Sequence, residues 1–151
     1  MLCNELHSDV TQSVVMCTLC VMYELLFIKK KGCIMTDSKL RDVSMDFSVE
    51  IINLVKELKA KHEYIISDQI GRSATSIGAN IYEANYAQSK KDFVSKLEIA
   101  LKEANETGYW IELLYKTGYI DNTQFNNLSG KCASIRVMLI ASCKTAKCSM
   151  K

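Results

Sequence analysis

Apolar residues recur every three or four positions in four separate stretches of the chain, a spacing typical of amphipathic helices. The first stretch runs from about residue 44 to 61 and the second from about 67 to 88. The third begins at Ser89 and ends at Gly118, and the fourth begins at Asp121. The residues predicted to face a core are Phe47, Ile51, Leu54, Val55, Leu58, Ile70, Ala74, Ile77, Ile81, Ala84, Phe93, Leu97, Ala100, Leu101, Ala104, Ile111, Leu114, Phe125, Leu128, Cys132, Ile135, Leu139 and Cys143.

The residues at the helix boundaries support this division. Ser89 with Asp92, and Asp121 with Gln124, are arranged like capping boxes at helix N-termini, and Gly118 suits a left-handed C-terminal cap. The chain has no proline, which breaks helix interiors, where average usage would give roughly seven. Short links imply antiparallel neighbours. We therefore predict an all-α fold, an up-down antiparallel four-helix bundle.

Two glycines lie inside the second predicted helix. Gly71 and Gly78 fall beside its apolar stripe, together with Thr75. Because glycine in a helix costs up to about 1 kcal/mol relative to alanine, we expect a neighbouring backbone to approach closely there.

The third predicted helix carries acid-to-base pairs at a spacing of four residues. This spacing and order favour ion pairs along one helix. The pairs are Asp92–Lys96, Glu98–Lys102 and Glu112–Lys116.

The first 34 residues do not match the rest of the chain. The apolar run Val14–Ile28 is shorter than the roughly 20 residues that span a bilayer, and Glu24 interrupts it. The charge order is the reverse of that in a signal peptide. We interpret residues 1–34 as an N-terminal extension, either upstream of the true start or an extra amphipathic helix, and residues 35–151 as the bundle domain. We expect no membrane association.

The seven cysteines avoid the long middle of the chain. Without a secretory signal, reduced thiols in a cytoplasm are expected. Cys17 and Cys20 form a lone CxxC with no second pair and no nearby histidine. This favours a role as small apolar packing residues over metal binding.

Residue types that carry catalysis are sparse. His7 lies in the extension and His62 lies at a helix end beside Glu63, so no Ser/His/Asp or Cys/His set can be named. The Glu-x-x-His signature of di-iron bundles, the GxGxxG motif and the Walker loop are absent. We therefore predict no enzyme, no catalytic residues, no metal and no cofactor.

The segment RSATSIGANIYEANYAQSKKDFVSKLEIALKEANETGYWIELLYKTGYI, residues 72–120, resembles the family of 23S rRNA-intervening-sequence proteins. The shared features, in order, are Arg-Ser-x-x-Ser-Ile-Gly-Ala-Asn, Glu-Ala, Ala-Gln-Ser, and Leu-x-Ile-Ala-Leu-Lys-Glu-Ala followed by Tyr-Trp. The resemblance covers roughly residues 35–147 and leaves residues 1–34 unmatched.

This resemblance implies a cytoplasmic bacterial protein whose four-helix subunits form a homopentameric ring. A related branch is the accessory variability determinant of diversity-generating retroelements, a basic pentamer that works with a reverse transcriptase and nucleic acid. The net charge of +2 here resembles the generic branch more than the strongly basic one.

Positive charge gathers at the C-terminal end of the chain, where bases but no acids follow Asp121. At 100° per residue, four of these bases share an arc of about 80° beside the core stripe. They are Arg136, Lys144, Lys147 and Lys151. The arc suits charge-driven contact with RNA or DNA phosphates, and equally suits a solvated helix end that complements the dipole. Arg72 is a further candidate phosphate contact, or else pairs with a carboxylate.

Several apolar residues lie away from the predicted core stripes. They are Tyr82 and Tyr86 on the second helix and Ile99, Tyr109 and Leu113 on the third. A patch of exposed apolar groups usually marks a partner surface, so we predict a homo-oligomer. Two functions remain open: a ring that binds nucleic acid through charge, and a protein-interaction scaffold that does not, with a reverse transcriptase or another protein as partner.

Overall fold

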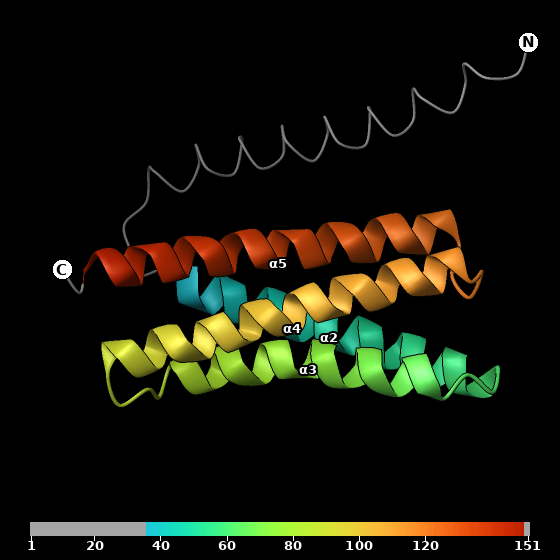
Figure 1. The fold of residues 1–151 in the computed structure, drawn as a ribbon, viewed down its shortest axis with the longest axis horizontal. Coiled ribbons are helices and arrows are strands. Elements are labelled where there is room, and N and C mark those ends of the chain that lie inside the picture. The colour runs from blue at the N-terminus through green and yellow to red at the C-terminus, as the bar shows by residue number, and fades with distance from the viewer. Residues whose placement is uncertain (1–35, 150–151) are drawn as a thin grey trace, which may run out of the picture. The chain divides into compact units, whose positions relative to one another are not determined.

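The computed structural model describes residues 36–149, which form four α-helices and no strand (Figure 1). The helices are α2 (Thr36–Ala60), α3 (Ile65–Ala84), α4 (Lys90–Lys116) and α5 (Asn122–Cys148). Each short link turns the chain back along the preceding helix, so neighbours run in opposite directions (Figure 1). The predicted all-α, up-down four-helix bundle is confirmed. The expected extension, residues 1–34, lies outside the described residues.

Two helix boundaries differ from the prediction. α2 begins at Thr36 rather than near residue 44, because Leu40 and Ser44 continue its buried face toward the N-terminus. α3 ends at Ala84 rather than near residue 88, because the amide groups of Asn85, Tyr86 and Ala87 turn back to carbonyl groups three residues earlier. Such tight turns are frequent at the ends of helices.

The helices pack unequally around the bundle. α3 packs extensively on α4 and on α2, and α4 packs on α5, whereas α2 and α5 have the smallest contact of the four neighbouring pairs. α2 and α4 are therefore diagonal to each other, as are α3 and α5. The contact between α3 and α4 is the most extensive one, and each surface groove lies between two neighbouring helices.

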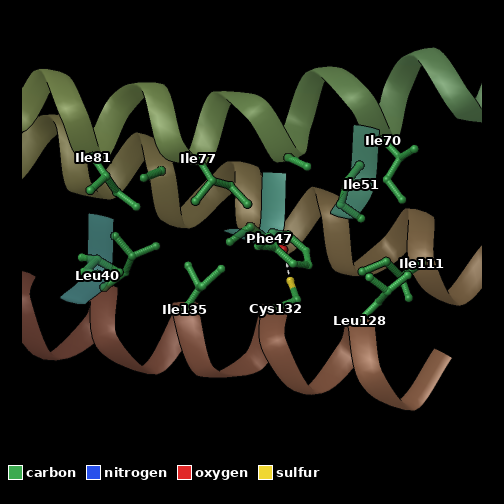
Figure 2. Packing of buried hydrophobic residues seen from close by; sticks show 14 of the residues in the cluster. Leu40, Phe47, Ile51, Ile70, Ile77, Ile81, Ile111, Leu128, Cys132 and Ile135 are labelled. Atoms are coloured by element: carbon green, nitrogen blue, oxygen red, sulfur yellow. Dashed lines mark hydrogen bonds between the residues drawn. The ribbon is translucent and has the colours of Figure 1, made fainter. Parts of the chain in front are cut away.

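The core contains most of the residues that the apolar repeat predicted. Figure 2 shows Phe47 in the middle of the cluster, with Ile77 and Ile135 reaching in from α3 and α5. Four predicted core residues are only partly buried and pack against the edge of the cluster, namely Val55, Phe93, Leu101 and Phe125. The residues buried beyond the prediction include Leu40, Val94 and Ile120.

Buried hydroxyl groups connect α3 to both of its neighbours. The Thr107 hydroxyl donates to Ser73 Oγ at 2.9 Å, which joins α4 to α3 inside the bundle. The Ser48 hydroxyl lies between the carbonyls of Ser44, at 2.8 Å, and Ala74, at 3.3 Å, which joins α2 to α3. Short hydroxyl side chains allow the helices to approach closely while each buried polar group keeps a partner.

The predicted caps are present. Ser89 Oγ accepts the Asp92 amide, and Asp121 with Gln124 forms a complete capping box. Gly118 has a φ of 76°, as expected for a left-handed cap. The Asp92 carboxylate accepts the amide of Gln88 rather than that of Ser89, so the first box is incomplete.

The predicted ion pairs on α4 are only partly correct. Glu112 and Lys116 pair at 2.6 Å as expected. Lys96 instead pairs with Glu83 of α3 at 2.5 Å, and Glu98 pairs with Lys147 of α5 at 2.5 Å. Both residues lie on flanks of α4 that face another helix, so a partner across the groove replaces the predicted partner one turn along.

The two glycines of α3 face α2, and the predicted close backbone lies at Gly78 but not at Gly71. A Cβ atom at Gly71 would lie 3.3 Å from Val55 Cγ2. A Cβ atom at Gly78 would lie 3.5 Å from Ser48 Oγ and 3.9 Å from the Ser44 carbonyl. Gly78 therefore leaves room for a methyl group but for nothing larger.

We expect opposite effects from two substitutions of Gly78. Alanine fits at ordinary contact distance, so Gly78→Ala should leave stability unchanged or raise it by up to about 1 kcal/mol through helix propensity. Gly78→Leu should lower stability by about 1–3 kcal/mol, because the larger side chain would displace the Ser48 hydroxyl from Ala74. Thermal or urea melts of both variants provide the test, and an unchanged Gly78→Leu melt would contradict close packing at this site.

We also expect the described cysteines to differ in reactivity. Burial raises the pKa of the Cys132 thiol to about 11, although the nearby Arg136 charge opposes this, and Cys132 Sγ donates to the Ala104 carbonyl at 3.2 Å. Cys148 is exposed. At about pH 8 iodoacetamide should therefore alkylate Cys148 in the folded protein and reach Cys132 only after unfolding, as followed by peptide mass spectrometry. Modification of both thiols at equal rates would contradict this.

Candidate nucleic-acid and assembly surfaces

The four bases predicted to act together on the last helix have different surroundings. Arg136 and Lys144 are exposed on α5, and neither forms an ion pair with any residue that the structure describes. Lys147 hydrogen-bonds to Glu98 of α4. That hydrogen bond and the opposite charges raise the pKa of Lys147 and lower that of Glu98. Lys151 lies outside the described residues.

α4 adds cations beside the α5 arc, which the sequence prediction missed. Lys102 lies about 40° from Glu98 on the helix, and its charge also contributes to lowering the pKa of Glu98. Lys90 donates to the Ser149 carbonyl at 3.3 Å, so the start of α4 lies beside the end of α5. Lys91 is exposed at the same end. The signal that identifies these residues is the α4–α5 contact, which spacing along one helix cannot supply.

We call this combined surface the basic face. It consists of Lys90, Lys91, Lys102, Arg136, Lys144 and Lys147. Glu98 is the acid that lies among them, and Ile140 is exposed between the cations of α5. Arg72 lies on α3, diagonal to α5, so the structure does not bring it to the basic face. Arg72 forms no ion pair within residues 36–149, so its predicted carboxylate partner is not found there.

Of the assembly residues predicted on the second helix, Tyr82 lies on α3 and Tyr86 in the turn that follows it; both are exposed and belong to a larger patch. Tyr82 and Tyr86 lie with ring centroids 5.7 Å apart, and Tyr86 is 74% exposed. Hydrogen bonding to Tyr82 and the negative charge of an ionised Tyr82 raise the pKa of Tyr86. Exposed apolar residues of α2 extend the surface. We call the set the α2–α3 patch: Met45, Val49, Ile52, Tyr82 and Tyr86.

The sequence prediction missed the α2 part of this patch. Met45, Val49 and Ile52 recur at helical spacing, but on the side of α2 opposite its buried stripe. A search of the sequence for a second apolar stripe could have found them. Tyr82 comes one turn after Gly78, which faces Ser44 and Ser48, so Tyr82 and Met45 lie near the same level of the bundle.

The predicted assembly residues of α4 form a separate surface. Ile99 and Tyr109 are exposed, and Leu113 is half-buried. The neighbouring Trp110 packs edge-on against Tyr109 and donates to Glu106 at 3.2 Å. We call Ile99, Tyr109 and Leu113 the α4 patch. Since α4 is diagonal to α2, the two patches lie on different sides of the bundle.

The groove between α2 and α5 holds a further polar contact. Lys131 pairs there with Glu50, whose second carboxylate oxygen is buried without a partner among the described residues. Val43, Phe47 and Val49 line the same open depression. Asp46 also lines the depression, and the ion pair of Lys131 with Glu50 joins the two neighbouring helices that contact each other least.

Among residues 36–149, the side chains that could bind a metal ion do not form a cluster. No three His, Cys, Asp or Glu side chains come together in a way that could hold a metal ion. His62 is exposed at the end of α2, with Nδ1 3.2 Å from the Tyr64 hydroxyl. None of the four described helices combines the length and apolar character needed to cross a membrane.

Comparisons with known proteins agree with this fold. The sequence model of the 23S rRNA-intervening sequence protein family matches residues 36–141. A solved structure of a protein of unknown function from the S23 ribosomal protein family of Bacteroides thetaiotaomicron has a TM-score of 0.71 and 50% sequence identity. The similarity covers 73% of this chain and 99% of that one. A search of curated proteins gives no match. The chain therefore belongs to the family of 23S rRNA-intervening sequence proteins.

Proposed function

We propose that the protein is a non-enzymatic homo-oligomer that binds nucleic acid by charge, without reading sequence. The basic face is the observation that carries this proposal. Six exposed cations from two helices surround one carboxylate, and five of the six form no ion pair with the described residues. Phosphate contacts of this kind supply affinity and position but carry no sequence information directly.

The surroundings of the cations favour a polyanion over a single small anion. The cations extend along the α4–α5 groove rather than around a pocket, and Arg136 and Lys144 lie about two helical turns apart. A nucleic-acid backbone presents phosphates at repeated intervals and releases counterions when cations neutralise them. Repetition of the basic face in an oligomer would multiply a modest charge per subunit.

A ring of five subunits in a bacterial cytoplasm is part of the proposal. The support for five is the family resemblance, and the support for assembly is the pair of exposed apolar patches. The same patches favour the second candidate function, a scaffold that binds a protein such as a reverse transcriptase and ignores nucleic acid.

The parent protein should be larger than one subunit in solution. We expect light scattering at micromolar concentration to give a mass near five times 17.0 kDa. Exposed tyrosines and aliphatic side chains that become buried between subunits supply the driving force. A mass of 17.0 kDa would overturn the proposed assembly.

We expect the basic face to control the salt dependence of binding. The variant Arg136→Gln, Lys144→Gln, Lys147→Gln should keep the oligomer intact and weaken binding to RNA and DNA. Its slope of log affinity against log salt should fall by about 1 for each phosphate that the protein no longer neutralises. Fluorescence anisotropy with labelled oligonucleotides over a range of salt concentrations measures both effects.

A matched variant controls for the change in net charge. Lys59→Gln, Lys61→Gln, Lys116→Gln removes the same charge at the end of the bundle where α2 and α4 terminate. This variant should keep most of the parent affinity and slope. Equal binding by the parent and the basic-face variant at every salt concentration would overturn the proposed contact. A parent that binds no nucleic acid at low salt would support the scaffold instead.

A further inference from the structure

An exposed aromatic side chain lies in line with cations of the basic face. At 100° per residue, Lys91 and Tyr109 both fall within about 20° of Lys102 on α4. Glu98 lies within about 40° of all three and bonds to Lys147, so this stripe is on the side of α4 toward α5. At 1.5 Å per residue, the stripe from Lys91 to Tyr109 is about 27 Å long. The basic face therefore ends, along α4, at a tyrosine that is 59% exposed.

The ring of Tyr109 is fixed by its neighbour. Trp110 packs edge-on against it, with ring centroids 4.9 Å apart, and the Trp110 indole in turn donates to Glu106 at 3.2 Å. An edge-on contact covers at most one face of the tyrosine ring, so the other face is open to a ligand. Tyr109 is thus a flat apolar surface whose orientation is set before anything binds to it.

The carboxylates that border the stripe are already occupied by donors within the protein. Glu98 accepts from Lys147, Glu106 accepts from Trp110, and Glu112 accepts from Lys116. Lys102, in contrast, forms no ion pair with any residue that the structure describes. A negatively charged chain that follows the stripe therefore meets a free cation next to Tyr109.

Cations in line with an exposed ring fit a ligand that carries both phosphates and flat rings at a regular spacing. Single-stranded nucleic acid has this chemistry, and its unpaired bases stack on aromatic side chains whatever their identity. In a duplex the bases are paired with each other, so only phosphates would reach the stripe. Phosphates at least 3.4 Å apart along the axis of a strand cover about 27 Å with about eight nucleotides or fewer.

We propose that the basic face takes a single strand of RNA or DNA, with phosphates along Lys102 and the cations of α5 and one base stacked on Tyr109. This inference rests on the proposed function and names the form of nucleic acid that is bound. It assigns Tyr109, the member of the α4 patch nearest to α5, to the strand. Ile99 lies about 80° farther round α4 and is not part of this contact.

Two substitutions of Tyr109 separate stacking from packing. Tyr109→Leu removes the flat ring but keeps an apolar side chain, and Tyr109→Phe keeps the ring. The matched control is Tyr64→Leu, which alters a tyrosine that is 53% exposed at the start of α3, a helix diagonal to α5. The probes are oligothymidylate, oligouridylate, an abasic strand of the same length and a long duplex. Fluorescence anisotropy at several salt concentrations measures their affinities.

We expect Tyr109→Leu to weaken the binding of oligothymidylate and oligouridylate by about 5- to 150-fold, the range found when a stacking aromatic is removed. The slope of log affinity against log salt should stay the same, because no phosphate contact is lost. The affinities for the abasic strand and for the duplex should not change. Tyr109→Phe and Tyr64→Leu should bind every probe as the parent does.

The single tryptophan of the chain supplies a second readout. Because Trp110 contacts Tyr109, a base stacked on the tyrosine lies close enough to change the emission of Trp110. Saturating oligothymidylate should therefore quench the tryptophan fluorescence of the parent, and a saturating abasic strand should leave it unchanged.

Three results would overturn the inference and leave charge-driven binding in place. They are equal binding of oligothymidylate by Tyr109→Leu and the parent, equal binding of oligothymidylate and the abasic strand by the parent, and a lower mass of Tyr109→Leu in light scattering. The last result would place the ring in a contact between subunits. A parent that binds no probe at low salt would overturn the proposed function itself, so the two failures are distinguishable.

Discussion

The close approach of α3 to both of its neighbours is the constraint on which the rest of the bundle depends. On one side, Gly78 lies against Ser44 and Ser48, and on the other the Thr107 hydroxyl reaches Ser73 inside the core. Short side chains at these positions let the helices meet closely, and each hydroxyl keeps a protein partner. A larger side chain at either contact would move α3 outward together with Tyr82 and Arg72, which it carries.

This arrangement separates two kinds of surface. Helices α2, α3 and α4 carry the exposed apolar patches, while α5 contributes half of the cations of the basic face. Any assembly that repeats the subunit would also repeat the basic face. The charge of one subunit is small, but its repetition at fixed spacing suits a long phosphate chain.

The sequence predicted the fold well because the apolar repeat, the caps and the core positions are local properties. The Asp121–Gln124 box and the glycine cap at Gly118 can be recognised without knowing any neighbour. The partners of Lys96 and Glu98 could not be predicted in that way, since both lie across grooves between helices. The predicted surfaces were incomplete for the same reason. Lys102 joins the α5 bases, and Met45 joins Tyr82, only once the packing order of the helices is known.

The pairing of Lys147 with Glu98 has a consequence for which anions the basic face could retain. A carboxylate fixed at hydrogen-bonding distance competes for Lys147 at a local concentration of about millimolar or higher. A dissolved chloride or phosphate ion at low concentration loses that competition. A polymer already held at Arg136 and Lys144 brings its next phosphate to Lys147 at a comparable local concentration and can displace Glu98. Glu98 would therefore weaken the binding of small single anions to Lys147 more than the binding of extended polyanions.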